Sequence, residues 1–166
     1  MKKNYGVVTF VGSPMTLLGE IIKVGDIAPD FMVIDSDLNT IHLRDFKGKT
    51  KVISVVPSID TGICDLQTRR FNQEALKRNN VVFFSISCDL PFALKRYGNV
   101  TDVDNIILAS DYKDTDFGLK YGLLVEELRL LARSIIILDK NNKVKYVEIV
   151  NEVASHPNYE LALPYI

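Results

Sequence analysis

Two near-continuous apolar runs, Lys51–Val56 and Val81–Ser87, constrain the fold of this chain more than any other feature. Apolar runs of this length are typical of strands that are covered on both faces of a sheet. The segment between them, Asp65–Lys77, has the spacing of a helix. The residues that recur at i, i+4, i+7 and i+11 form the face that we expect to pack on the sheet: Cys64, Thr68, Phe71 and Ala75.

The rest of the chain continues this alternation of strands and helices. Further strands are expected at Phe31–Ile34, Thr40–Leu43, Ile106–Ala109, Ser134–Leu138 and Val144–Val150, and further helices at Pro91–Tyr97, Asp114–Tyr121 and Asn158–Leu163. Ahead of them, Gly6–Ile22 flanks the turn signal Gly12-Ser13-Pro14 and predicts a β-hairpin. This order predicts an α/β, thioredoxin-like fold, in which helices flank a mixed central sheet and residues 1–24 add an N-terminal hairpin extension.

Composition limits the possible partners of the chain. Its 166 residues are 47% hydrophobic and contain no repeat or linker, so we expect one domain over residues 1–166. The net charge of −1 favours neither a nucleic acid nor a membrane surface as a partner, and it suits a small substrate. The sequence shows no secretory signal and no membrane-spanning run, so we expect a cytoplasmic protein.

Cys64 lies at the junction between a predicted strand and a predicted helix. The first turn of a helix has unpaired N–H groups and the positive end of the helix dipole, and both favour a thiolate, which is the reactive form of cysteine. Candidate cations for this thiolate are Arg69, Arg70 and the distant Arg133. The alternative is that Cys64 is a small buried hydrophobic residue and that Arg69 and Arg70 belong to a solvated helix face.

Arg133 interrupts an otherwise apolar run, and a guanidinium beside a buried strand needs a partner. That partner is either the site at Cys64 or a carboxylate such as Asp65 or Glu127. Thr61 precedes Cys64 by three residues, so its hydroxyl can meet the sulfur or its target, cap the helix, or do both.

Other chemistries have little support in the sequence. No Cys-x-x-Cys motif is present, which disfavours an ordinary dithiol oxidoreductase. Two cysteines with only His42 and His156 lack the spacing of a metal site, and both histidines are expected at the surface. No glycine-rich phosphate loop occurs, so we expect neither a metal nor a cofactor.

The segment from Pro57 to Cys64 matches the active-site pattern of peroxiredoxins, in which a proline, a threonine and a cysteine stand where Pro57, Thr61 and Cys64 stand here. The run that continues to Asn72 resembles one branch of that family, the bacterial thiol peroxidases, which are atypical two-cysteine peroxiredoxins. Three further stretches resemble the same branch: Gly25–Phe31, Asp89–Ala93 and Leu130–Arg133.

The resemblance implies a thiol-dependent peroxidase that reduces hydrogen peroxide and organic hydroperoxides and is regenerated by thioredoxin or another thiol. Cys64 would be the peroxidatic cysteine, which is oxidised to a sulfenic acid. Thr61 and Arg133 would hold the peroxide and stabilise the thiolate, and Pro57 would shield the pocket. The resemblance also implies a homodimer.

The sequence departs from the thiol peroxidases at position 98, where a resolving cysteine is usual and this chain has Gly98. Cys88 is the only other thiol. It is either a packed core residue or an unusual resolving residue, so the sulfenic acid on Cys64 is reduced either directly by an external thiol or through Cys88. The alternatives to a peroxidase are a redox sensor and a thiol oxidoreductase without efficient peroxidase turnover.

Overall fold

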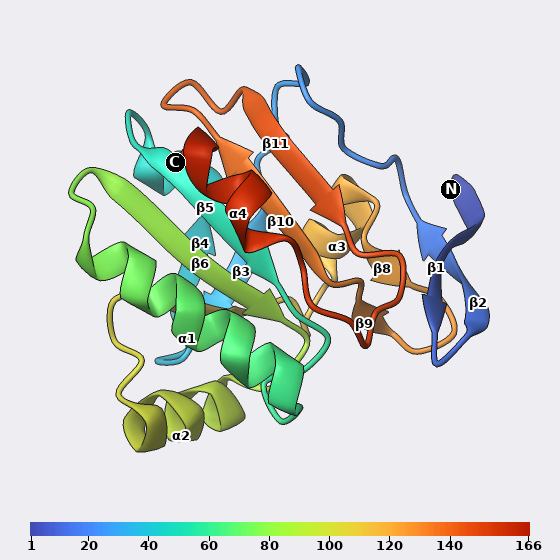
Figure 1. Cartoon of the computed structure of the whole chain (residues 1–166), viewed down its shortest axis with the longest axis horizontal. Helices are drawn as coiled ribbons and strands as arrows, with labels where there is room; N and C mark the ends of the chain where they lie inside the picture. The colour runs from blue at the N-terminus through green and yellow to red at the C-terminus, as the bar shows by residue number, and fades with distance from the viewer.

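The computed structural model describes all 166 residues, and its central element is a seven-stranded mixed sheet (Figure 1). Its strands follow the order β11-β10-β5-β6-β7-β3-β4, and only the β5–β6 and β6–β7 pairs are parallel. The strands are β3 (Met32–Asp35), β4 (Thr40–His42), β5 (Thr50–Val55), β6 (Val81–Ser87), β7 (Ile107–Ser110), β10 (Ser134–Leu138) and β11 (Val144–Ile149). All seven coincide with strands that the sequence predicts, and no strand end differs from the prediction by more than one residue.

Helices cover both faces of this sheet. They are α1 (Gly62–Leu76), α2 (Pro91–Thr101), α3 (Asp116–Tyr121) and α4 (Tyr159–Ala162), with 3₁₀ turns at Leu43–Phe46 and Leu163–Tyr165. One face lies under α1, α2 and α4, and α3 lies on the other face (Figure 1). None of these helices has the length and apolar character needed to cross a membrane.

α1 begins at Gly62, three residues before the predicted start at Asp65. Its N-cap is Thr61, whose side chain accepts a hydrogen bond from the backbone N–H of Cys64. A threonine cap allows the helix to start upstream of the apolar spacing from which its start was predicted. Cys64 therefore lies inside the first turn of α1.

The other three helices also differ in extent from the prediction, and α3 does so only by starting two residues later, at Asp116. α2 continues four residues beyond the predicted end at Tyr97 and passes through Gly98, because a single glycine weakens a helix without ending it. The last helix is only Tyr159–Ala162, and the chain then tightens into a 3₁₀ turn that contains Pro164.

The N-terminal hairpin belongs to a second sheet, which the sequence does not predict. This sheet has the order β1-β2-β8-β9, with β1 at Lys3–Phe10, β2 at Ser13–Leu18, β8 at Leu124–Val125 and β9 at Leu130–Leu131. β8 and β9 are two residues long each, which is too short to show an alternating pattern. The hairpin is therefore joined by strands from a distant part of the chain.

The turn of the hairpin also differs from the prediction. Val11 and Gly12 form it with φ of 49° and 80°, whereas Ser13 and Pro14 belong to β2. Two consecutive residues with positive φ match the right-handed twist of the flanking strands, which explains why the turn needs only these two residues. Phe10, at the end of β1, is thereby fixed next to the turn.

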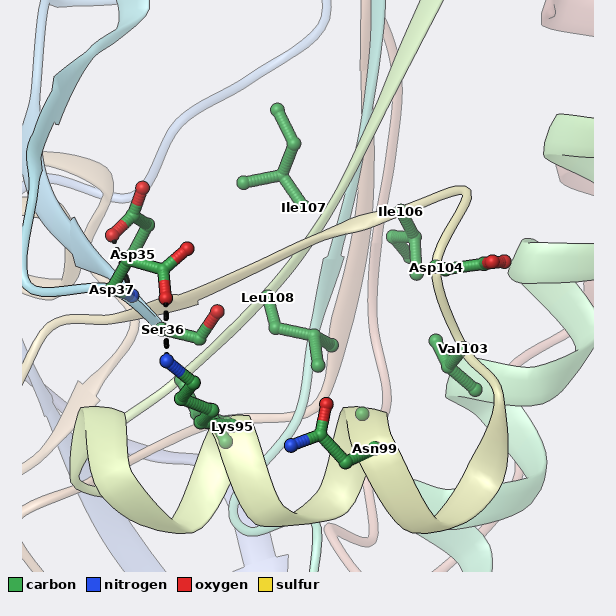
Figure 2. Close-up of a pocket in the computed structure, with 12 residues that line it drawn as sticks. Asp35, Ser36, Asp37, Lys95, Asn99, Val103, Asp104, Ile106, Ile107 and Leu108 are labelled. Carbon is green, nitrogen blue, oxygen red and sulfur yellow. Dashed lines mark hydrogen bonds and ion pairs between the residues drawn. The ribbon is translucent and has the colours of Figure 1, made fainter.

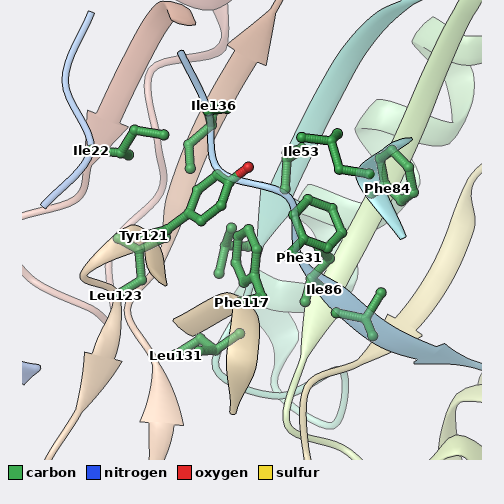
Figure 3. Packing of buried hydrophobic residues seen from close by; sticks show 14 of the residues in the cluster. Ile22, Phe31, Ile53, Phe84, Ile86, Phe117, Tyr121, Leu123, Leu131 and Ile136 are labelled. Atoms are coloured by element: carbon green, nitrogen blue, oxygen red, sulfur yellow. The ribbon is translucent and has the colours of Figure 1, made fainter. Parts of the chain in front are cut away.

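On the α3 face, aromatic side chains form the centre of the core (Figure 3). Phe31 contacts Phe117 and Tyr121 edge to face, with ring centroids 5.1 Å and 5.7 Å apart. Phe84 of β6 packs on Phe31 from the sheet at 6.2 Å. Edge-to-face pairs add to the stabilisation from buried area. This side of the sheet is therefore a packed structural core, and Cys64 lies on the opposite side, on the buried face of α1.

Candidate active site

Cys64 is the third residue of α1, and its side chain has no exposed area. Thr61 Oγ1 accepts from the Cys64 N–H at 3.4 Å and donates to the Ser58 carbonyl at 3.3 Å. Thr61 is thus the cap of the helix and part of the wall of a nearby cavity. The helix start supplies N–H groups and a positive dipole end next to the sulfur, which favour an anion there.

Arg133, which directly precedes β10, contacts Cys64. Its side chain is 2% exposed, and its Nη2 lies 3.1 Å from Cys64 Sγ. The other two bonds of the guanidinium go to neutral groups: Nε donates to the Val153 carbonyl at 2.8 Å and Nη1 to Gln67 Oε1 at 2.9 Å. No carboxylate pairs with Arg133, so its positive charge is directed at the sulfur.

Of the two alternatives for Arg133, the salt bridge to Asp65 or Glu127 is not formed. Asp65 accepts from Arg69 on the surface of α1, and Glu127 accepts from the Thr16 N–H in the second sheet. Both carboxylates find partners close to the surface, where solvent lowers the cost of their charge.

Among the three candidate cations, Arg133 alone contacts the sulfur. Arg69 Nε donates to Asp65 at 2.8 Å, and Arg70 Nη2 lies 3.3 Å from Glu160. These two arginines pair with carboxylates at the surface of the protein, as expected if they belong to a solvated helix face. The distant residue is the one that the fold brings to the site.

Gln67 is a part of the site that sequence reasoning missed. It is fully buried, its Nε2 donates to Ser54 Oγ at 2.8 Å, and its Oε1 accepts from Arg133. A buried amide in this position orients the guanidinium without neutralising it. The signal was present in the sequence, since Gln67 is a polar residue at i+3 from Cys64, on the face expected to be buried.

A cavity of about 270 Å³ lies next to Thr61 and Arg133, two residues whose side chains contact Cys64. Its lining is mostly apolar and comes from distant parts of the chain: Phe10, Pro57, Thr61, Gly62, Ile63, Arg133, Val153 and Ala154. Pro57 lines this cavity, as the resemblance to peroxiredoxins implies. Phe10 and Val153 were not anticipated, because no local pattern relates the hairpin or the segment after β11 to the cysteine.

Asp89 fixes the loop that carries Pro57 and Thr61. Its carboxylate accepts from Ser58 Oγ at 2.7 Å, from the Ile59 N–H at 2.9 Å and from Ser87 Oγ at 2.7 Å. Three hydrogen bonds to one carboxylate tie the loop to the end of β6, and they hold one wall of the cavity in place.

Cys88 lies on the other side of the sheet from Cys64. Side chains alternate along β6, so Phe83 packs with Cys64 whereas Phe84 and Ile86 pack on the α3 face, and Cys88 packs on that same face. Both cysteines are free thiols. Burial, and then the nearby Asp111 carboxylate, raises the pKa of Cys88 to about 12. The structure therefore does not bring the two thiols together.

Gly98 lies on α2, beside a second cavity of about 430 Å³. Figure 2 shows this cavity between α2 and the Asp35–Asp37 turn, with Lys95 paired to Asp37 across it. A Cβ atom at position 98 would lie 3.2 Å from Leu108 Cδ1, so a small side chain needs only a slight shift of that leucine.

Comparisons with known proteins agree with this geometry. The model of the redoxin family matches residues 23–163. The chain is 55% identical to a thiol peroxidase of Oceanobacillus iheyensis, covering 96% of this chain and 97% of that protein, and 52% identical to a thiol peroxidase of Bacillus subtilis, covering 92% of each.

Solved structures are similar to this chain over nearly its whole length. A crystal structure of a peroxiredoxin-like protein from Aquifex aeolicus has a TM-score of 0.90 at 36% identity and covers 99% of this chain and 96% of that one. A thiol peroxidase from Chromobacterium violaceum has a TM-score of 0.84 at 24% identity, covers 95% of this chain and 93% of that one, and supports the fold alone. The predicted thioredoxin-like fold is confirmed.

Proposed function

The chain belongs to the redoxin family and has the thiol-dependent peroxidase activity of the thiol peroxidases that it resembles, and we propose that Cys64 is the nucleophile of this activity. The observation that carries the proposal is the 3.1 Å contact between Arg133 Nη2 and Cys64 Sγ, made by a guanidinium that no carboxylate shares. A buried sulfur beside an unshared positive charge and a helix start is stabilised as the thiolate.

In the first step, the thiolate attacks the terminal oxygen of the peroxide. An S–O bond forms, the O–O bond breaks, and the leaving hydroxide or alkoxide takes a proton from solvent, so that Cys64 becomes a sulfenic acid and the peroxide becomes water or an alcohol. Arg133 and the Thr61 hydroxyl are positioned to stabilise the negative charge on the oxygens as the bond breaks.

We propose hydrogen peroxide and organic hydroperoxides as substrates. The cavity of about 270 Å³ has space for a substituent, and apolar groups of Phe10, Pro57 and Val153 line it. An apolar lining supports binding of an alkyl group, while Arg133 and Thr61 interact with the peroxide oxygens.

The sulfenic acid is then reduced by an external thiol, supplied by thioredoxin or by another thiol compound. The position of Cys88 on the opposite face of the sheet and its raised pKa support a cycle in which only Cys64 reacts. One thiolate displaces hydroxide from the sulfenic sulfur and forms a mixed disulfide. A second thiolate attacks the reductant's sulfur and releases the Cys64 thiolate and an oxidised disulfide.

We also propose that the protein is a single domain, acts in the cytoplasm and forms a homodimer. These proposals rest on the resemblance to thiol peroxidases and on the composition of the chain.

The test is rapid mixing of the reduced protein with hydrogen peroxide and with cumene hydroperoxide, followed by peroxide consumption and by mass spectrometry of Cys64. The wild type and Cys88→Ser are expected to consume one equivalent rapidly, and Cys64→Ser to consume none. Unchanged consumption by Cys64→Ser would overturn the assignment of the nucleophile.

A further inference from the structure

The carboxylate of Glu152 connects two segments that line the proposed substrate cavity, the hairpin turn and the chain after β11. Its Oε1 accepts from the Val11 N–H at 2.7 Å and from the Ala154 N–H at 3.4 Å. Its Oε2 accepts from the Gly12 N–H at 3.2 Å and from the Thr9 hydroxyl. One side chain therefore fastens the tip of the hairpin to the segment after β11.

The turn that Glu152 binds has a strained backbone. Val11 and Gly12 have φ of 49° and 80°, a region that glycine adopts freely and a β-branched residue avoids. Successive N–H groups in such a turn form a concavity that binds anions, and the carboxylate occupies it. Hydrogen bonds, first of all from the Thr9 hydroxyl, lower the pKa of Glu152, so the group is ionised at neutral pH. The turn is therefore stabilised by a charged partner from a distant segment.

The base of the hairpin is held without the carboxylate. The Thr9 N–H donates to the Asn151 carbonyl at 2.7 Å, and the Val153 N–H donates to the Thr9 carbonyl at 2.9 Å. Val153 also packs in a buried cluster with residues of both hairpin strands. The Val153 carbonyl, which accepts from Arg133 at 2.8 Å, is thus fixed by contacts that do not involve the Glu152 side chain.

Beyond Thr9, the hairpin has fewer contacts of its own. Pro14 stands opposite Thr9 and has no N–H to donate to the strand pair. Phe10 pairs with Ser13 across the turn, but Val11 is 76% exposed, so the turn is not held by apolar packing. The position of the Phe10 ring at the cavity therefore depends on the carboxylate that binds the turn.

Hydrogen peroxide and organic hydroperoxides use this part of the cavity differently. Both place their oxygens at Thr61 and Arg133, and hydrogen peroxide has no further group. An organic hydroperoxide also has a substituent, for which the apolar lining at Phe10 and Val153 provides the contact surface. A displaced Phe10 ring would lower the rate only for the substrate that reaches it.

We propose that Glu152 is a positioning residue that determines specificity: its carboxylate holds the hairpin turn so that the Phe10 ring closes the cavity around the substituent of an organic hydroperoxide. Glu152 does not line the cavity and acts through Phe10. The inference rests on the proposed function for its effect on rates, whereas the role of the carboxylate in the turn does not depend on that function.

The test is Glu152→Gln, which keeps the shape of the side chain but replaces one acceptor oxygen with an NH₂ group that faces N–H donors. In rapid mixing, the rate constant for cumene hydroperoxide is expected to fall by about tenfold, and that for hydrogen peroxide to change by less than about twofold. The matched control is Glu126→Gln, whose carboxylate pairs with Lys3 at the opposite end of β1. It is expected to change neither rate.

A second variant tests whether the effect comes from the turn. Val11→Asn introduces a residue that adopts positive φ more readily at this turn position. Combined with Glu152→Gln, it is expected to return the rate with cumene hydroperoxide to within about threefold of the wild type, because the turn then needs the carboxylate less.

Amide hydrogen exchange provides a readout that does not depend on activity. Exchange at Val11 and Gly12 is expected to accelerate in Glu152→Gln, to slow again when Val11→Asn is added, and to stay unchanged in Glu126→Gln.

The outcomes separate this proposal from the proposed function. An unchanged ratio of the two rate constants in Glu152→Gln would overturn the specificity role. An equal fall in both rate constants would also overturn it, because the carboxylate would then support the site as a whole. A wild type that reacts with neither peroxide would overturn the proposed function, while faster exchange at Val11 and Gly12 in Glu152→Gln would still support the role of the carboxylate in the turn.

Discussion

The guanidinium of Arg133 reaches the sulfur of Cys64 across 69 positions of the chain, with Nη2 at 3.1 Å from Sγ. Its remaining hydrogen bonds go to a backbone carbonyl and to the side-chain amide of Gln67, both of which are neutral. A carboxylate in either place would hold the arginine equally well and would cancel its charge. Neutral groups therefore orient Arg133, and its positive charge remains available to the sulfur.

Gln67→Glu tests whether the unshared charge of Arg133 matters, because it replaces the neutral amide with a carboxylate of nearly the same shape. The introduced carboxylate would be paired with Arg133 in a buried position, so we expect the thiolate to lose stabilisation and the rate of peroxide attack to fall by about ten- to a hundredfold. The measurements are the ultraviolet absorbance of the thiolate as a function of pH and rapid-mixing kinetics. Gln73→Glu, an exposed position on the same helix, is the control. Equal rates in the two variants would show that the charge of Arg133 is not what matters.

Cys88→Ser is expected to leave peroxidase turnover with dithiothreitol within about twofold of the wild type. Cys88 packs on the face of the sheet opposite Cys64, and burial raises its pKa to about 12, so it is a protonated and unreactive thiol near neutral pH. Mass spectrometry after one equivalent of hydrogen peroxide should find a sulfenic acid on Cys64. A Cys64–Cys88 disulfide in the wild type would contradict the expectation and restore Cys88 as the resolving residue.

The raised pKa of Asp111 leads us to expect that the free energy of unfolding depends on pH, independently of catalysis. Its buried carboxylate accepts from the N–H groups of Phe117 and Gly118, yet burial raises its pKa from 3.8 to about 6. The folded state therefore binds the Asp111 proton more tightly than the unfolded state does. The stabilisation is complete below about pH 4 and is lost as the pH rises to about 6, by at most about 3 kcal/mol.

Urea unfolding of the wild type and of Asp111→Asn at several pH values isolates this contribution, because other carboxylates affect both proteins equally. The free energy of unfolding of the wild type, relative to the variant, should decrease between pH 4 and pH 6. A constant difference across this range would show that Asp111 is ionised throughout.

The sequence predicts the central sheet and its helices because each of these elements comes from one continuous stretch of chain, whose apolar pattern is bounded by turn residues. It does not predict β8 and β9, whose pairing with the hairpin depends on contacts more than a hundred residues apart. The same limit applies to the site. Arg133 is detectable as a lone charge in an apolar run, but Phe10 and Val153 carry no signal until the fold brings them to the cavity.

Gln67 shows a different limit. Its place on the buried face of α1 follows from the helical spacing, yet a polar residue there has no evident role until its partner is known. The role appears only with Arg133, which comes from the strand side of the core. Local patterns thus predict which side chains are buried, and tertiary contacts decide which of the polar ones form the site.

Gly98→Cys places a thiol where the resemblance to thiol peroxidases expects the resolving residue. The backbone at this position is helical, and the new Cβ atom would lie 3.2 Å from the flexible end of Leu108, so the variant should fold with stability within about 1 kcal/mol of the wild type. After one equivalent of hydrogen peroxide, we expect a disulfide between Cys64 and the introduced cysteine, formed when the new thiolate displaces hydroxide from the sulfenic sulfur.

Intact-mass spectrometry distinguishes this disulfide from the sulfenic acid of the wild type. Val100→Cys, which puts an exposed thiol on the same helix, is the control and is expected to keep the sulfenic acid. A sulfenic acid that persists in Gly98→Cys would contradict this expectation and would show that a thiol at position 98 does not reach Cys64.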